Sequence, residues 1–208
     1  MQKIEWNAGS LSLIGANFFP LAGALFFGWP LSGIIFLYWM ENVVIGIFNI
    51  ARMTRSTAAV SPPNTFRMNG RPYVPGMKRL LIFFFILHYG LFTLIHGVFV
   101  SVAFGQPEIG ALDFLVAFGS LFVSHGISYQ SNFIGQKEYE RISAPELFIH
   151  PYKRIIVLHL TVLVGGMLAQ LISVPLVAAV FLICLKTAVD LAIHLWEHRK
   201  FASLAPVA

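Results

Sequence analysis

The chain has 208 residues, of which 57% are hydrophobic and only 11% are charged, with a formal net charge of +5. A water-soluble domain carries roughly 25% charged residues, so this composition excludes a water-soluble globular protein and indicates a lipid bilayer as the solvent. The single cysteine, Cys184, excludes a disulfide framework.

Six apolar segments predict an all-α, polytopic membrane protein with six transmembrane helices, forming one domain over residues 1–208. Each segment is continuously apolar and lacks the alternation typical of transmembrane β-strands. The expected spans are residues 10–27, 31–53, 77–104, 111–131, 153–172 and 174–197. Before the fifth span, Ser143 is expected to cap a short interfacial helix with Pro145 in its first turn.

The positions of the basic residues predict the orientation. Lys and Arg gather before the first span, in the second and fourth connections and after the last span, whereas the other three connections contain none. By the positive-inside rule, both termini are expected to be cytoplasmic, and we expect a multi-pass membrane protein. The net positive charge is therefore a topology signal and a contact for anionic membrane lipid, and no nucleic-acid partner is expected.

Polar residues inside the expected spans are the most informative feature of the sequence, because they are costly in a bilayer and mark function or tight pairing. The second span carries a stripe on one helical face: Tyr38, Glu41, Asn42, Asn49 and Arg52. In the sixth span, Lys186, Asp190 and His194 recur every four residues. Other spans contribute His88, His96, His125 and His159.

Counting along the helices places His125, His159 and Asp190 together in the cytoplasmic half of the bilayer. Glu41, His88 and Lys186 are expected nearer the midplane, and His96 alone toward the outside. One interpretation is a divalent metal site, with zinc or iron bound by His125, His159 and Asp190 and a fourth ligand from His194 or His88. Glu41 would then be the general base for a metal-bound water, with Lys186 or Asn42 polarising the substrate. This pattern predicts a metal-dependent hydrolase acting on a lipid or lipid-linked substrate.

Other interpretations use the same residues. The polar groups are also what a transporter or a proton or cation relay needs. Alternatively, they hold the helices of a structural scaffold together through hydrogen bonds and ion pairs, such as Lys186 with Asp190 or Glu41. A b-type haem between His88 and His159 ranks below these, because no histidine pair is evidently level on adjacent helices.

The segment Tyr38-Trp39-Met40-Glu41-Asn42, followed by Gly46, Asn49 and Arg52, resembles an uncharacterised bacterial family of multi-pass membrane proteins. The stretches from His88-Tyr89-Gly90 to His96-Gly97 and from Pro151-Tyr152 to His159 extend the resemblance over nearly the whole chain. The resemblance implies a bacterial inner membrane as the location but implies no activity. It also suggests that the stripe and the histidines belong to one site. The alkaline ceramidase and adiponectin receptor group binds an intramembrane zinc with a set of residues that is chemically similar to one found here. The similar residues of this chain are His125, His159, Asp190, His194 and Ser128. Rhomboid proteases share the helix count, but their Gly-x-Ser-x-Gly motif is absent.

Overall fold

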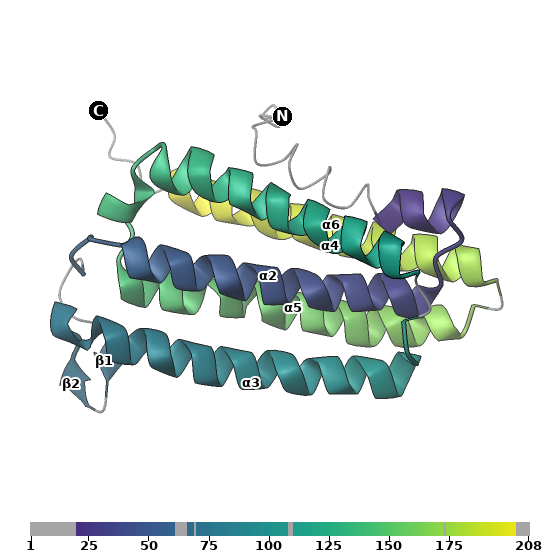
Figure 1. Cartoon of the computed structure of the whole chain (residues 1–208), viewed down its shortest axis with the longest axis horizontal. Helices are drawn as coiled ribbons and strands as arrows, with labels where there is room; N and C mark the ends of the chain where they lie inside the picture. The colour runs from purple at the N-terminus through teal and green to yellow at the C-terminus, as the bar shows by residue number, and fades with distance from the viewer. Residues whose placement is uncertain (1–19, 61–65, 69, 108–109, 173, 203–208) are drawn as a thin grey trace.

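A computed structural model describes residues 20–60, 66–68, 70–107, 110–172 and 174–202. It does not describe the side chains of residues 190–202 or of scattered other positions, most of which lie in the helix of residues 144–170. It consists of long helices lying side by side (Figure 1). The helices are α2 (Leu31–Arg55), α3 (Lys78–Phe104), α4 (Ala111–Ser128), α5 (Ala144–Gln170) and α6 (Pro175–Ala202). Residues 20–26 are also helical. The all-α expectation is confirmed.

Helix α2 is the centre of the bundle, since it packs against α3, α4, α5 and α6. Its polar stripe therefore faces other helices, and Glu41, Asn42 and Asn49 are each at most 3% exposed. Close approach to α3 depends on glycine. A Cβ at Gly46 would lie 2.6 Å from the ring of Tyr89, and one at Gly97 would lie 2.6 Å from the ring of Trp39. Small residues at such points allow helices in lipid to pack closely.

The outer surface of the bundle is apolar. Helices α3 and α4 expose many large hydrophobic side chains, among them Leu87, Leu91, Ile95, Val102, Leu112, Leu115 and Ile127. A soluble monomer rarely exposes so extensive an apolar surface. Three described helical segments, Leu31–Arg55, Pro75–Phe104 and Ala111–Ile134, are long and apolar enough to cross a membrane. The structure is thus compatible with a membrane protein.

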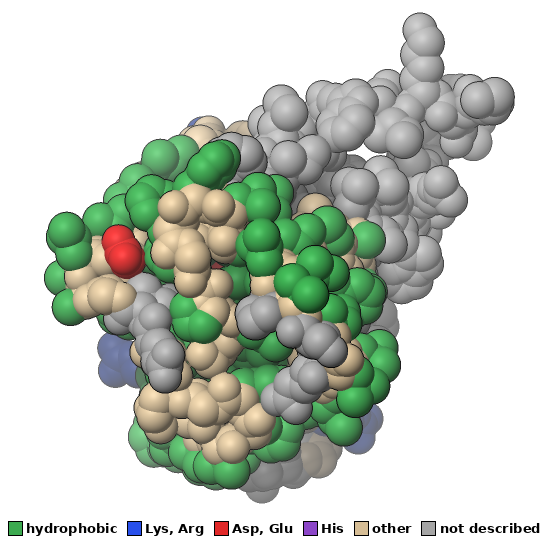
Figure 2. All heavy atoms as spheres, turned by 90° about the vertical axis from the view of Figure 1, so that its right-hand side faces the viewer, with side chains coloured by type: hydrophobic (Ala, Val, Ile, Leu, Met, Phe, Trp, Pro, Cys, Tyr) green, Lys and Arg blue, Asp and Glu red, His purple; other side chains and the backbone are tan. Residues whose placement is uncertain are grey.

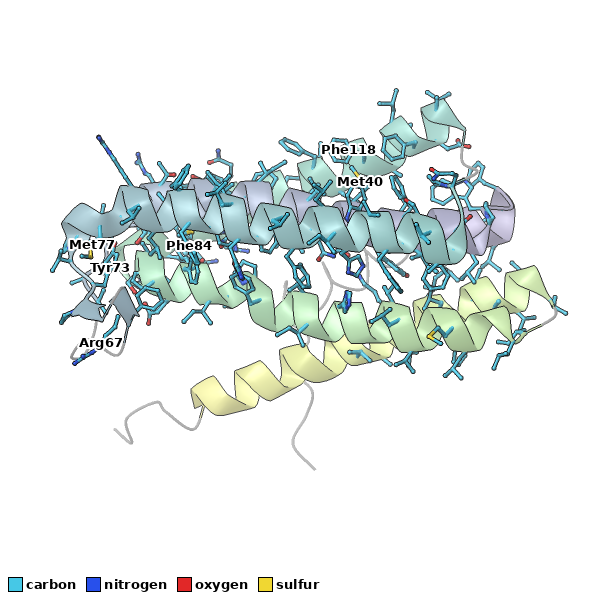
Figure 3. The ribbon with its side chains drawn as sticks, turned by 90° about the horizontal axis from the view of Figure 1, so that it is seen from below. Met40, Arg67, Tyr73, Met77, Phe84 and Phe118 are labelled. Atoms are coloured by element: carbon cyan, nitrogen blue, oxygen red, sulfur yellow. The ribbon has the colours of Figure 1, made fainter. Side chains whose placement is uncertain are left out.

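The connections carry small elements that the sequence analysis did not predict. Strands β1 (Arg67–Met68) and β2 (Arg71–Pro72) form an antiparallel hairpin with Gly70 at φ +75°, and the 3₁₀ turn η1 (Pro75–Met77) follows it. Tyr73 and Met77 lie beside this hairpin (Figure 3). Helix α4 continues as the π-helical segment η2 (Tyr129–Ile134), and the 3₁₀ turn η3 (Glu138–Glu140) follows.

Helix α5 differs most from the expected boundaries. The expected interfacial helix and the expected fifth span at 153–172 are one continuous helix that begins at Ala144. Ser143 precedes it as expected, and its N–H and hydroxyl donate to Oε2 of Glu146 at 2.8 and 2.6 Å. This is half of a capping box, which satisfies polar groups where the helix begins. Pro151 lies inside the helix and does not end it.

Candidate functional site

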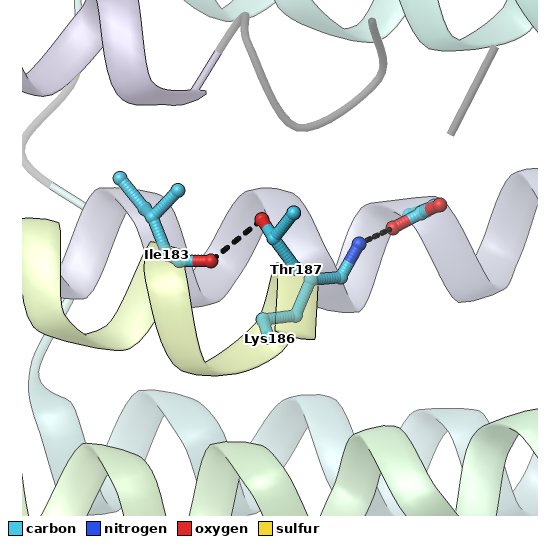
Figure 4. A network of polar contacts seen from close by, with 4 residues as sticks. Ile183, Lys186 and Thr187 are labelled. Carbon is cyan, nitrogen blue, oxygen red and sulfur yellow. Dashed lines mark hydrogen bonds and ion pairs between the residues drawn. The ribbon is translucent and has the colours of Figure 1, made fainter. Parts of the chain in front are cut away.

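The polar centre of the bundle is an ion pair between α2 and α6. The ammonium Nζ of Lys186 donates to Oε2 of Glu41 at 2.9 Å, and the two side chains are 3% and 4% exposed (Figure 4). Nζ also lies 4.7 Å from the centre of the Tyr38 ring, at cation–π distance. At the next residue of α6, the Thr187 hydroxyl donates to the Ile183 carbonyl one turn earlier in the same helix, 2.7 Å away. The sequence offered Lys186 with Asp190 or Glu41 as an ion pair, and the structure confirms the pair with Glu41.

The rest of the stripe continues from this ion pair along α2. Asn42 is buried beside Glu41, and its backbone carbonyl accepts a 2.9 Å hydrogen bond from the hydroxyl of Tyr89. Further along, Nδ2 of Asn49 donates to the Leu147 carbonyl of α5 at 3.0 Å. Arg52 lies near the end of α2, with its guanidinium carbon 5.8 Å from the centre of the Phe133 ring. The stripe thus connects the buried ion pair with one end of the bundle through side chains that face neighbouring helices.

The Leu147 carbonyl has a specific reason to bind Asn49. In an α-helix this carbonyl accepts from the residue four positions later, which here is Pro151, and proline has no N–H to donate. A carbonyl without a donor is costly in a bilayer. The amide of Asn49 supplies that donor, so its role is structural. The sequence contained an indication of this contact: Asn49 lies in an apolar helix, and Pro151 leaves a carbonyl of another helix without its usual donor.

Four histidines that the sequence placed inside spans, His88, His96, His125 and His159, do not form one cluster in the described part of the chain. His88 is exposed, its Nδ1 lies 2.8 Å from the Tyr152 hydroxyl in a hydrogen bond, and its ring stacks on Phe84. His125 stacks on the ring of Phe48, with centroids 6.2 Å apart.

His159 of α5 contacts His96 of α3 through the Nδ1 atoms of both rings. The expectation that His96 lies alone is therefore wrong. It rested on a fifth span that begins at residue 153, whereas α5 begins at Ala144, so His159 lies further along its helix than expected.

The expected metal centre stays a prediction. Within the part of the chain that the structure describes, no three His, Cys, Asp or Glu side chains come together closely enough to hold a metal ion. The backbone of α6 includes Asp190 and His194, but the side chains of these two expected ligands lie outside the described residues. A shallow hollow lined by Phe36, Pro107, Ala111, Phe114 and Leu115 contains no ionisable group and offers no alternative centre.

These features define a class: an all-α protein with membrane-compatible helices and a charged pair at the centre of its bundle. The chain belongs to the Family of unknown function (DUF6498), whose model matches residues 3–206. The resemblance to an uncharacterised family is thereby confirmed. No curated protein and no solved structure matches the chain.

Proposed function

We propose that the protein crosses a bacterial inner membrane six times, with both termini in the cytoplasm. The distribution of charge supports this arrangement. The described basic side chains near the helix ends lie where α2 ends and α3 begins, and in the connection from α4 to α5: Arg52, Arg55, Lys78, Arg79, Lys137 and Arg141. Nζ of Lys78 donates to two carbonyls where α2 ends, those of Thr54 and of the C-cap residue Ser56. The opposite end of the bundle is mainly hydrophobic, and visible Lys and Arg side chains lie only at its distant edges (Figure 2).

In this membrane, the protein functions as a proton or small-cation relay, and the Glu41–Lys186 ion pair is the observation that carries the proposal. Removing two charges from water costs several kcal/mol each, and an apolar pair of similar size would give equal or greater stability. Charged groups inside spans therefore mark ion pathways and proton relays. The stripe of Asn42, Asn49 and Arg52 continues from the pair toward the basic end.

The pair itself can move a proton without creating net charge. The Lys186 ammonium passes a proton to the Glu41 carboxylate along the 2.9 Å hydrogen bond, which leaves a neutral amine and a neutral carboxylic acid. The amine then takes a proton from one side, and the acid releases its proton to the other. Each cycle restores the original ion pair after one proton has passed.

Proton flux through reconstituted vesicles tests this function. Purified protein is inserted into liposomes that contain a pH-sensitive dye, and a valinomycin-driven potassium potential draws protons inward. The wild type should acidify the interior faster than protein-free vesicles. The double variant Glu41→Gln/Lys186→Met, which keeps the shapes but removes both charges, should reduce the rate to that of protein-free vesicles. Glu140→Gln, on an exposed residue of η3, is the matched control. Equal rates for the wild type and the double variant would refute the relay.

A metal-dependent hydrolase that acts on a membrane lipid is a second candidate, favoured by the contact of His159 with another imidazole. It requires a third ligand, for which Asp190 and His194 stay the candidates, and a base other than an ion-paired Glu41. The purified wild-type protein should then contain zinc and hydrolyse a lipid ester. The variant Asp190→Ala should lose both the zinc and the turnover. Protein free of zinc that gains no thermal stability from added zinc would exclude it.

A further inference from the structure

A polar pair lies on the outer surface of the bundle, where α3 and α5 run side by side (Figure 1). Nδ1 of His88 is 2.8 Å from the hydroxyl of Tyr152, and the imidazole of His88 is exposed. Its neighbours on α3 are exposed apolar side chains, namely Phe84, Leu87 and Leu91. In the proposed membrane position of the bundle, such a surface faces lipid, so the imidazole of His88 faces lipid as well.

The contact with Tyr152 determines which ring nitrogen of His88 carries the proton. Among the described residues, the Tyr152 hydroxyl has no acceptor other than Nδ1 of His88. Its O–H therefore donates to Nδ1, and a neutral imidazole that accepts at one nitrogen carries its proton at the other. Nε2 of His88 is thus an N–H donor, and no described residue bonds to it. Because a donor without an acceptor is costly at a surface that faces hydrocarbon, an acceptor oxygen from a ligand would stabilise it.

The ring of His88 also forms part of an aromatic surface. Its centroid lies 5.5 Å from that of Phe84, and the two ring planes differ by only 14°. Phe148 packs against both partners of His88, with its centroid 5.9 Å from Phe84 and 5.6 Å from Tyr152. Two exposed and nearly parallel rings give a flat apolar surface on which another planar ring stacks well. The site therefore combines an N–H donor with a stacking surface.

The position of His88 along α3 limits the class of ligand. His88 lies ten residues after Lys78, where α3 begins, which corresponds to about 15 Å along the helix. The hydrocarbon core of a bilayer is about 30 Å thick, and the polar groups of phospholipids lie outside it. A ligand that brings an acceptor oxygen to this depth is therefore one whose polar group is dissolved in the hydrocarbon itself.

We propose that His88 and Phe84 bind the head group of a membrane quinone. A quinone dissolves in the bilayer through its isoprenoid tail, and its planar ring carries carbonyl oxygens. One carbonyl accepts the hydrogen bond from Nε2 of His88, while the ring stacks on Phe84. Tyr152 is a positioning residue, because its hydroxyl keeps the proton of the imidazole on Nε2. Binding at this site rests on the membrane position of the bundle and is independent of the proton relay.

Quinone binding by the full-length protein in phosphatidylcholine nanodiscs tests the site. The probe is decylubiquinone, and calorimetric titration measures its affinity, with empty nanodiscs as the blank. His88→Leu should weaken binding by about tenfold, the effect expected for one lost hydrogen bond. His88→Gln keeps an N–H near the position of Nε2 and should retain most of the affinity. The matched control is His150→Leu, which changes an exposed histidine two residues before Tyr152 and thus on a different side of α5.

Two further variants separate stacking from positioning. Phe84→Leu removes the stacking surface and should weaken binding by about two- to tenfold. Tyr152→Phe removes the hydroxyl that holds the tautomer, so nitrogen NMR of His88 should change from a single tautomer to a mixture, with a smaller loss of affinity.

Equal affinity in the wild type, His88→Leu and Phe84→Leu would overturn the site, and so would binding no stronger than to empty nanodiscs. A phospholipid that copurifies with the wild type and is lost in His88→Leu, without binding of decylubiquinone, would assign the site to phospholipid instead. Failure of the wild type to enter nanodiscs would overturn the membrane position and the quinone site with it.

Discussion

For Glu41, the helical spacing of the sequence predicts the face on which the side chain lies, but not the partner that it contacts. The spacing of the stripe on α2 predicted that Glu41, Asn42 and Asn49 share one buried face, and each is at most 3% exposed. Their partners could not be read from the same spacing, because a helical period gives the direction of a side chain but not the helix that it meets. The ion pair with Lys186 spans 145 positions of the chain. The sequence offered Asp190 and Glu41 as the two possible partners of Lys186, and tertiary packing shows that Glu41 is one.

The ion pair predicts an asymmetric response to substitution. Glu41→Gln leaves the Lys186 charge buried without its counter-charge, and Lys186→Met does the same to Glu41. Each should lower the free energy of unfolding by about 3 kcal/mol or more. The double variant Glu41→Gln/Lys186→Met removes both charges and should recover most of the loss. Thermal unfolding in one detergent, followed by circular dichroism, provides the comparison. Single variants as stable as Glu140→Gln would show that the pair is not coupled.

Asn49 and Pro151 predict a second coupling. Asn49→Leu keeps the size of the side chain but leaves the Leu147 carbonyl without a donor, at a cost of about 1–3 kcal/mol. Pro151→Ala supplies a helical N–H to the same carbonyl. In that background Asn49→Leu should cost much less, giving a coupling energy of about 1 kcal/mol. A double-mutant cycle on chemical unfolding measures it. Strict additivity of the two substitutions would mean that Asn49 does not replace the missing N–H.

At the scale of elements, the sequence predicted apolar helices well and their boundaries unevenly. The expected spans at 31–53 and 77–104 agree with α2 and α3 to within two residues at each end. The fifth span was expected to begin at residue 153, after a separate interfacial helix capped by Ser143, whereas α5 is one helix that contains Pro151. In the structure, the Asn49 amide compensates for the proline, so the helix continues through it. The hairpin β1–β2 was missed, although its Asn69-Gly70 sequence is a strong turn signal.

Glycine substitutions test the contact of α2 with α3. Gly90 and Gly97 lie seven residues apart on α3, but of the two only a Cβ at Gly97 meets another side chain, the Trp39 ring at 2.6 Å. Gly97→Ala should therefore destabilise the bundle by about 1–3 kcal/mol through overpacking. Gly90→Ala has open space and should be neutral or stabilising by up to about 1 kcal/mol, since alanine favours the helix. The difference between the two unfolding midpoints is the readout. If both variants behave alike, the α2–α3 contact is looser than the structure shows.

For the whole molecule, composition predicted a membrane-compatible helical bundle, but the contact between His96 and His159 was beyond the reach of the sequence. Depth along a helix follows from residue counting only if the helix start is known. The early start of α5 moved His159 along its helix, and it lies against His96. His88 and His125 contact different neighbours because each helix is rotated about its axis so that its histidine faces a different part of the bundle. This rotation cannot be predicted from a continuously apolar segment, since apolar side chains face both lipid and protein.

The orientation of the bundle leads to the last prediction. With Cys184→Ala as background, single cysteines at Gln136 and Gln106 lie on exposed positions at opposite ends of the described bundle, and Ser203 follows α6 outside the described residues. Because Lys and Arg gather at the end that carries Gln136, the positive-inside rule places this end in the cytoplasm. In intact cells, a membrane-impermeant maleimide should label cysteine at 106 and leave those at 136 and 203 unlabelled until the membrane is opened. In the proposed topology, an even number of spans separates the N-terminus from position 136 and from position 203. All three should therefore lie on the cytoplasmic side, and a tag at residue 1 should also be inaccessible from outside intact cells. Labelling of position 136 from outside would mean that the bundle has the opposite orientation. The distribution of Lys and Arg would then no longer support the proposed topology.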